Sequence, residues 1–438
     1  MINDDKDKVS KQHPDYIGLQ DKRGAFFAVK GGTDAIRKEG VKFLPKYPAE
    51  SDTDYQERLK QATIDGLVQG GVESLTGAVM DGPIDVSKVN SAITPLLDNI
   101  DNRGNTFDVF ARDVFDASFD GCSIVVADMP MLDEQGKQTQ AVYGAEADKM
   151  LDLRPYLVLY KAQDVINWRF RINPVTKQLE LTLLVVRVIS EEPDGEFGTK
   201  NVTRYCVWRM GTAVTWEHWI QPEKDSDPVL EKSGTIATAT RIPARIIGKL
   251  NADPKLLVES RLEIKAYQKE SSVDTIEYLS VPLMCFIGRT DGVGEAMPYG
   301  PSSFVDVPIG GDAKFVQIDA AGLDKLKGTI DDIKAEIKAR LNYTASAPMP
   351  EKTATQSVIE DKDKQARLIV WAEELEDGLA GSLDDMCMLI KAKENNLIEL
   401  MTAWKKAEIA AAEQKEVDAE LHKATVAKMT AGGGNAGS

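Results

Sequence analysis

The sequence contains few of the residues from which redox and metal sites are usually built. Its 438 residues include 4 cysteines and 3 histidines, and the cysteines show no CxxC spacing. We interpret the cysteines as small buried side chains of a protein kept in a reducing compartment, where disulfides are rare. The histidines lie far apart in the sequence, so neither a zinc site nor a Cys/His catalytic pair is expected, and we predict no cofactor. The cysteines are Cys122, Cys206, Cys285 and Cys387.

Long apolar stretches are also missing. No run reaches the roughly 18 apolar residues that a membrane-spanning helix needs. The opening residues, MINDDKDKVSKQHPDY, have no apolar segment, so no signal peptide is expected. The sequence therefore predicts no membrane partner.

Positive charge is in the minority. The chain has 53 Lys and Arg against 70 Asp and Glu, which gives a formal net charge of -17. Proteins that grip nucleic acid by neutralising its phosphates are usually basic, so a sequence-reading DNA regulator is disfavoured. The balance remains compatible with a protein past which DNA slides without sticking.

Common catalytic motifs are absent as well. No GxxxxGK[ST], GxSxG or HExxH motif occurs, and GVGEAM at 292–297 lacks the third glycine of a dinucleotide-binding motif. The acidic pairs Asp331-Asp332 and Asp384-Asp385 could bind a metal. Neighbouring residues on a helix point about 100° apart, however, so we interpret both pairs as parts of a solvated helix face.

An aromatic cluster is the remaining candidate for direct chemistry. Trp208, Trp216 and Trp219 could stack nucleic-acid bases, but the face of a sheet or hairpin explains them more simply. Nothing in the sequence supports catalysis, and we predict that the protein is not an enzyme.

Hydrophobic spacing and turn residues predict an α+β chain in which helical and strand-rich segments alternate. The long helix near its end contains Gly378 and Gly381, each costing about 1 kcal/mol relative to alanine, and we expect a bend there. The predicted elements are helices within 14–97, a continued helical pattern over 91–120 that ends at Gly121, a buried strand at 122–128, a sheet over 150–250, helices over 254–280, 322–341 and 355–391, strands near 283–288 and 314–318, and a helical tail from 397.

The segment 322–341 predicts a strongly amphipathic helix. A charged helix with one apolar stripe is stabilised by packing that stripe on neighbours. If the neighbours are copies of the same chain, head-to-tail packing can close a ring. The pattern alone favours the other interpretation, an ordinary surface helix on a monomeric core. The stripe consists of Leu323, Leu326, Ile330, Ile333, Ile337 and Leu341.

Short motifs spread over about residues 14–345 follow one another in an order that resembles a known family. They are Phe43-Leu44-Pro45, Tyr55 and Arg58, Gly77 and Pro83, Gly121 with Asp128 and Pro130, Ile242-Pro243, and Ser272, Asp274, Pro282 and Gly288. In this order they resemble the portal proteins of tailed bacteriophages, the head-to-tail connectors, in their portal-like branch. The sequence departs from the family pattern at Phe43, where tyrosine is usual, and in the Ala-Arg after Pro243.

The resemblance implies a ring, expected to be a dodecamer, at one vertex of the capsid. It implies an α+β portal fold with a mixed α/β wing, a two-helix stem, a small β clip and a helical crown. The implied divisions are an N-terminus at 1–13, a wing at 14–253, stem helices at 254–281 and 321–341, a clip at 282–320, a tunnel loop at 342–355, a long wing helix at 356–391, and a crown with a flexible C-terminus at 392–438.

The resemblance also assigns roles to residues of this chain. The candidates that face DNA in the channel are Lys325, Lys334, Lys338, Arg340 and Lys352, for which helix-surface solubility is the competing interpretation. The subunit interface would use Leu326, Ile330, Ile333 and Ile337. The tunnel loop would include Asn342, Tyr343, Pro348 and Pro350. The clip would contact partners through Arg289, Asp291, Tyr299 and Phe304, unless these only shape its loops.

The function implied is a conduit for double-stranded DNA during packaging and ejection, bound without sequence preference. Further expected partners are the terminase large subunit, the head–tail adaptor and the major capsid protein. The protein would be assembled in the host cytoplasm and located in the virion. The alternatives are another virion component, such as an adaptor or scaffold, and a metal-dependent nuclease.

Overall fold

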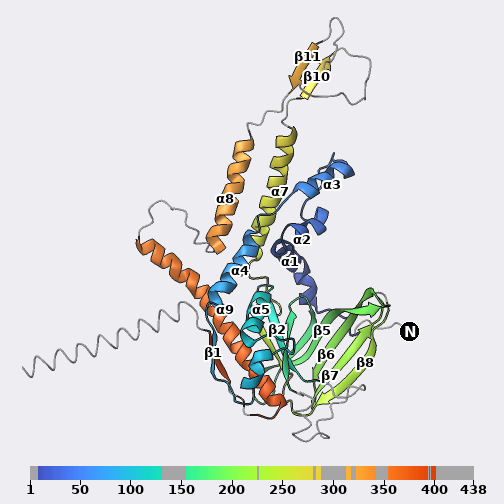
Figure 1. Ribbon diagram of the computed structural model, residues 1–438, viewed down its shortest axis with the longest axis vertical. Coiled ribbons are helices and arrows are strands. Elements are labelled where there is room, and N and C mark those ends of the chain that lie inside the picture. Colours follow the sequence, from blue (N-terminus) through green and yellow to red (C-terminus); the bar gives the residue numbers. More distant parts are fainter. Residues whose placement is uncertain are drawn as a thin grey trace, which may run out of the picture. The chain divides into compact units, whose positions relative to one another are not determined.

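The computed structural model describes residues 8–130, 154–223, 226–279, 283–287, 312–316, 322–341, 354–392, 394 and 396–400. The chain is a mixed α and β structure, as the sequence predicts (Figure 1). It divides into two compact units. The first comprises Met1–Gly24, Gly71–Leu257 and Ser346–Ser438, and the second comprises Ala25–Gly70 and Val258–Ala345. Helices α1 (Pro14–Lys30) and α4 (Leu67–Val79) contribute residues to both.

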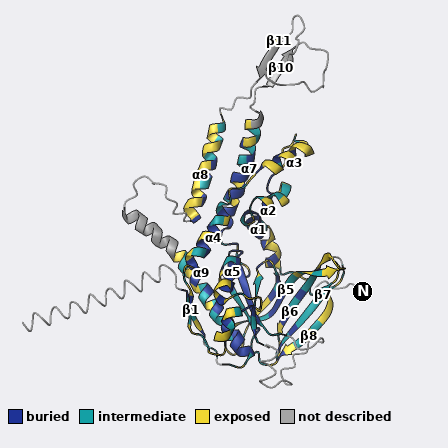
Figure 2. Ribbon diagram, viewed as in Figure 1, coloured by how far each residue is buried: buried dark blue, intermediate teal, exposed yellow. Residues whose placement is uncertain are grey.

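The first unit contains a three-stranded sheet in the order β3-β2-β9, built from Tyr156–Lys161, Cys122–Asp128 and Ala244–Gly248. Both neighbours pair with β2 in antiparallel fashion. The predicted strand at 122–128 is confirmed, and its first six residues are buried. Helices α5 (Phe107–Ser118) and α9 (Ala354–Leu389) pack on this sheet and on each other. Figure 2 shows how deeply α5 and the end of α9 are buried.

The same unit contains a five-stranded antiparallel sheet in the order β4-β5-β6-β7-β8. Its strands follow one another along the chain, as expected from the turn residues between 150 and 250. Trp208 on β6 lies opposite Trp216 on β7, and both side chains are buried, which confirms the structural interpretation of these two tryptophans. The strands are Val165–Ile172, Leu179–Asp194, Gly198–Met210, Val214–Gln221 and Val229–Ile236.

Two predictions for this unit are wrong. Ile84–Lys88, placed among helices, is strand β1, and Leu397–Leu400, placed in a helical tail, is strand β12. The two strands pair with each other, so the backbone hydrogen bonds of each come from a segment about 300 residues away. Such a partner overrides local helix preference and leaves no trace in local spacing. A short 3-10 helix, Thr94–Asn99, precedes α5.

The glycines of α9 have a different role from the predicted bend. A Cβ atom on Gly378 would lie 2.2 Å from Cγ1 of Ile247, and one on Gly381 would lie 3.0 Å from Nε of Arg245. Both neighbours belong to β9. The glycines therefore let α9 approach the sheet closely, which compensates for their poor helix propensity.

The second unit is mainly helical. Ser51 caps α3 (Asp52–Gln61) by accepting a hydrogen bond from the Asp54 amide, as expected of an N-cap serine. Helix α7 (Leu257–Leu279) begins three residues after Pro254, so that proline precedes the helix instead of standing in its first turn. The remaining elements are α2 (Gly32–Lys38), a 3-10 helix (Gly40–Lys42), β10 (Leu283–Ile287), β11 (Asp312–Val316) and α8 (Leu323–Leu341).

In chain order, an antiparallel hairpin of β10 and β11 separates α7 from α8. The predicted strands near 283–288 and 314–318 are thus confirmed to within two residues, and so is the amphipathic helix. Lys327 on α8 bonds Glu277 on α7, and Lys334 bonds Glu270. Because the residue numbers rise along α8 as they fall along α7, the two helices form an antiparallel pair.

Candidate functional site

The apolar stripe of α8 is already covered by its own chain. Ile330, Ile333 and Ile337 are at most 6% exposed, while Leu326 is half-buried. The premise that a single copy leaves this stripe open is therefore wrong. The physical reason is that the stripe is satisfied by intramolecular packing, as in any amphipathic helix on a core. The stripe gives no support to a contact between subunits.

The charged face of α8 is divided between internal ion pairs and free surface. The Lys334 ammonium lies 2.6 Å from Oδ2 of Asp65 and also contacts Glu270. Burial by itself lowers the pKa of Lys334, but its hydrogen bonds to these two carboxylates outweigh burial and raise that pKa. Lys334 therefore neutralises two carboxylates of its own chain, and its assignment to a DNA-facing surface stays a prediction that these ion pairs do not support.

Two other cationic side chains of α8 are exposed to solvent. Lys325 and Lys338 are exposed. Arg340 is exposed too, but its guanidinium donates two hydrogen bonds to Oε1 of Glu336 one turn earlier. An exposed pair of this kind contributes little to stability and can exchange partners. The described part of the candidate channel surface thus consists of Lys325, Lys338 and, in a paired form, Arg340.

Several predicted site residues lie outside the described residues. These are Lys352, the tunnel-loop residues Asn342, Tyr343, Pro348 and Pro350, and the clip residues Arg289, Asp291, Tyr299 and Phe304.

Residues that carried the family resemblance meet around Arg58. Its guanidinium donates two hydrogen bonds to Glu50, at 2.7 and 2.8 Å, and one to the carbonyl oxygen of Pro45 at 2.8 Å. The guanidinium carbon lies 4.2 Å from the ring centre of Tyr47 and 5.5 Å from that of Tyr55. The sequence motifs at 43–45 and 55–58 are therefore two sides of one buried ion-pair cluster.

The cluster continues onto α7. Nη1 of Arg58 donates to Oγ of Ser271 at 3.3 Å, and Tyr47 shares a 2.8 Å hydrogen bond with Ser272. The hydrogen bonds from Arg58 hold the pKa of Glu50 below its ordinary value. Glu50 was not identified from the sequence, because nothing in its neighbourhood indicates that it pairs with Arg58. Four of the five N–H donors of Arg58 are engaged inside the fold, so this residue acts structurally.

The two acidic pairs lie in different environments. Asp331 and Asp332 are exposed, as predicted. Asp385 is instead fully buried and lies between two arginines, so its placement on a solvated face is wrong. Asp384 accepts hydrogen bonds from the backbone and side-chain nitrogens of Asn396. Among the described residues, no cluster of His, Cys, Asp and Glu has the arrangement of a metal site.

Lys255 is a largely buried cation of the first unit. Its ammonium lies 4.7 Å from the ring centre of Trp371 and donates to Oγ of Ser118 at 3.1 Å. Burial lowers the pKa of Lys255 to about 8. A lysine beside a serine can activate it as a nucleophile, but Ser118 is completely buried and gives its own proton to the carbonyl of Phe115. The pair therefore holds α5 in place and cannot reach a substrate.

Comparison with known families matches part of the chain. The family described as "Domain of unknown function (DUF4055)" matches residues 258–389, and this domain often occurs in phage-related proteins. The matched segment runs from α7 through the hairpin and α8 to the end of α9. No curated protein matches the chain. None of the helices in the described ranges is long and apolar enough to cross a membrane.

Proposed function

We propose that this chain is a portal protein of a tailed bacteriophage, which forms a ring at one capsid vertex and conducts double-stranded DNA during packaging and ejection. The observation that carries the proposal is the order of α7, the β10–β11 hairpin and α8. It is the order expected of two stem helices separated by a clip. The segment belongs to the part of the chain that is similar to a domain found in phage-related proteins.

The pairing of α7 with α8 supports this assignment. Two helices joined through a hairpin can form a rigid strut only if they are fixed against each other. Lys327–Glu277 and the contacts of Lys334 with Asp65 and Glu270 supply such fixation along two turns of the pair. The buried isoleucines of α8 add the apolar part of the same packing.

The distribution of charge is also compatible with DNA that slides. Each neutralised phosphate steepens the salt dependence of DNA binding by about one log unit per log unit, so many contacts would act as a brake. The chain is acidic overall, and Lys325 and Lys338 are isolated cations on the exposed face of α8. We propose these two lysines as the DNA-facing residues of this helix.

Because Ile330, Ile333 and Ile337 serve the interior of one chain, the contacts between copies in the proposed ring come from other surfaces. The proposal keeps the expected partners: a packaging motor, a head–tail adaptor and the major capsid protein. It assigns no catalytic step to the chain, and places it in the virion.

Electron microscopy of the purified full-length chain tests the proposal. We expect ring-shaped particles with an axial hole, and class-averaged top views give the number of subunits. A monodisperse monomer at high protein concentration would contradict the proposal. Particles without a hole would favour a scaffold, and binding only to a preformed ring would favour an adaptor.

A nuclease assay separates the remaining alternative. We expect linear DNA to stay intact when it is incubated with the chain and Mg²⁺. Magnesium-dependent cleavage that is lost in Asp331→Asn or Asp384→Asn would instead identify a nuclease.

A further inference from the structure

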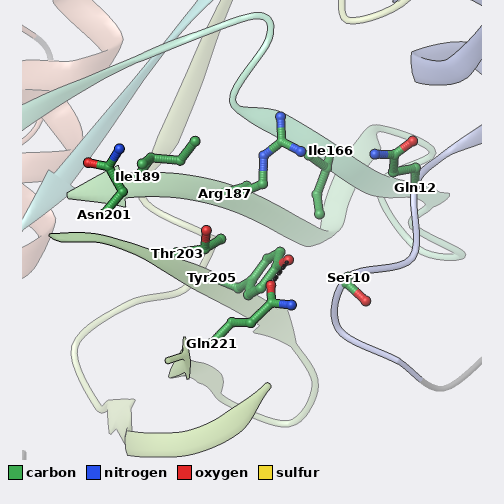
Figure 3. A pocket seen from close by; sticks show the side chains of 9 residues that line it. All are labelled: Ser10, Gln12, Ile166, Arg187, Ile189, Asn201, Thr203, Tyr205 and Gln221. Atoms are coloured by element: carbon green, nitrogen blue, oxygen red, sulfur yellow. Dashed lines mark hydrogen bonds between the residues drawn. The ribbon is translucent and has the colours of Figure 1, made fainter. Parts of the chain in front are cut away.

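A polar hollow lies on one face of the five-stranded sheet (Figure 3). Its volume is about 520 Å³, within the range of roughly 300–1,000 Å³ that is usual for ligand sites. A single small ion would leave most of this space unfilled. The lining residues are Ser10, Gln12, Ile166, Arg187, Ile189, Asn201, Thr203, Tyr205 and Gln221.

The sheet register explains why these side chains converge. Arg187 lies opposite Tyr205, and Ile189 lies opposite Thr203, on the adjacent strands β5 and β6. Since alternate residues of a strand point to the same face, these four side chains share one face of the sheet. Figure 3 shows the segment before α1, with Ser10 and Gln12, on the other side of the hollow.

The lining is positively charged in a chain that is strongly acidic. Arg187 is its one charged residue, and no Asp or Glu belongs to it, although the chain has 70 of them. Nη2 of Arg187 donates to the hydroxyl oxygen of Tyr16 at 3.4 Å, and that hydroxyl donates to the carbonyl of Gln163. Within the described ranges, no carboxylate forms an ion pair with this guanidinium.

The positive charge of Arg187 influences the pKa of Asp164, although the two side chains form no ion pair. Burial raises the pKa of the Asp164 carboxyl, and the charge of Arg187 opposes that rise. The Asp164 carboxylate accepts its hydrogen bond from the backbone of Lys161 and not from Arg187. The half-buried guanidinium of Arg187 therefore retains N–H donors that can bind a carboxylate in bidentate geometry.

The other polar groups add donors around the same space. The Tyr205 hydroxyl donates its proton to Oε1 of Gln221 at 3.0 Å, and Nε2 of Gln221 donates to the carbonyl of Ser226 at 2.8 Å, so these two side chains are fixed in the lining and the donors for a ligand come from its other members. Oε1 of Gln12 accepts from Gln20, so the Gln12 amide presents its nitrogen as a donor. Asn201 and Thr203 contribute an amide and a hydroxyl along β6.

Apolar contacts limit the ligand further. Ile189 lines the hollow and is 62% exposed, whereas Ile166 is buried. A ligand that satisfies both the donors and Ile189 carries a carboxylate on a short aliphatic stem, as aspartate and glutamate side chains do. A smaller hollow shares Ser10 and Gln12 and is also lined by Lys8 and Lys11, and the Lys8 ammonium lies 3.3 Å from Oδ1 of Asp227.

We propose that this hollow is a docking site for an acidic peptide segment of a partner protein. One carboxylate of the segment is held by Arg187, and its stem packs on Ile189, the exposed apolar side chain of the lining. The proposal does not depend on the assignment of the chain as a portal protein, because it rests on the first unit alone.

Fluorescence anisotropy with the full-length chain tests the proposal. The probe is a labelled hexapeptide in which glutamate alternates with serine, and its control carries glutamine in place of glutamate. We expect the acidic peptide to bind at least about tenfold more tightly than its control, because charge-assisted hydrogen bonds are lost with the carboxylates. Equal affinities would overturn the proposal.

Variants locate the binding. Arg187→Met is expected to weaken binding of the acidic peptide about tenfold or more, while Arg169→Met, at an exposed arginine of the neighbouring strand, leaves it unchanged. Asn201→Asp serves if Arg187→Met does not fold, because Asn201 is exposed and the new carboxylate repels the ligand. Unchanged binding in Asn201→Asp and in folded Arg187→Met would refute the site.

Inorganic phosphate distinguishes a peptide from a free anion. We expect phosphate at the peptide's concentration to leave the anisotropy unchanged. Displacement of the peptide by equimolar phosphate would overturn the assignment to a peptide and indicate a site for small anions.

Discussion

Asp385 and Arg245 form a bidentate ion pair inside the first unit. Nε and Nη2 of Arg245 donate to Oδ2 and Oδ1 of Asp385, each at 2.8 Å. Arg241 donates a third hydrogen bond to Oδ1, also at 2.8 Å, and reaches Glu394 with its other nitrogen. The carboxylate is completely buried, so α9 is joined to β9 and to the segment before it by a charge that has no contact with water.

Removing this carboxylate should destabilise the protein strongly. Asp385→Ala leaves Arg241 and Arg245 without their shared buried carboxylate, and breaking a buried ion pair costs about 3–5 kcal/mol. We expect a loss near the lower end of that range in the free energy of unfolding, since both arginines are about one-third exposed. Urea unfolding measures it. Asp377→Ala, at an exposed position of the same helix, should change stability by less than about 0.5 kcal/mol, and equal losses would contradict the prediction.

Glycine-to-alanine substitutions on α9 and on α8 should change the stability of the protein in opposite directions. Gly378→Ala improves helix propensity by about 1 kcal/mol but forces a Cβ against Ile247, and overpacking costs about 1–3 kcal/mol. We expect a net loss of stability. Gly328→Ala on α8 meets nothing within 4 Å and should stabilise the protein by up to about 1 kcal/mol. Thermal unfolding compares the two, and a stabilising Gly378→Ala would show that α9 does not approach β9 this closely.

The burial of Lys255 should make stability depend on alkaline pH. Its pKa is about 8 in the folded chain against an ordinary value of 10.5. Below pH 8 the lysine is charged in both states, and the cost of burying the charge is fully present. Between about pH 8 and 10.5 the unfolded chain binds more protons, so stability rises with pH.

Comparison with Lys255→Met isolates this effect. The stability of the natural chain relative to Lys255→Met should rise by on the order of 3 kcal/mol across that pH range. Lys249→Met, at an exposed lysine nearby in the sequence, should show no such trend. Denaturant titrations at several pH values measure the difference, and a flat difference would mean that Lys255 keeps its ordinary pKa.

Lys334 and Lys338 of α8 should contribute differently to the stability of the protein. Lys334→Met leaves Asp65 and Glu270 without their shared cation, and we expect a loss of about 1 kcal/mol because all three side chains are partly exposed. Lys338→Met should leave the stability of the chain unchanged. The loss in Lys334→Met should also shrink at high salt, because screening weakens the ion pairs in the natural chain. Denaturation in low and high salt tests both expectations.

Side-chain periodicity along the sequence correctly predicted several individual helices and strands. The apolar stripe of α8, the buried strand Cys122–Asp128 and the alternation of strands and turns after residue 150 can all be read from spacing, because side-chain periodicity is a property of the element itself. The stripe did not reveal its partner. An amphipathic helix has the same pattern whether its own chain or another copy covers it.

The pairings that decided the site are long-range. Asp385 lies 140 residues from Arg245, and Lys334 is far from Asp65 in the sequence, so their roles could not be separated from those of solvated neighbours such as Asp331 and Lys338. The sequence by itself determined the mixed α and β class, the helix–hairpin–helix order and the net negative charge. The tertiary structure alone decided which charges are neutralised inside the fold, because an ion pair depends on distance in space, and spacing along the chain does not encode it.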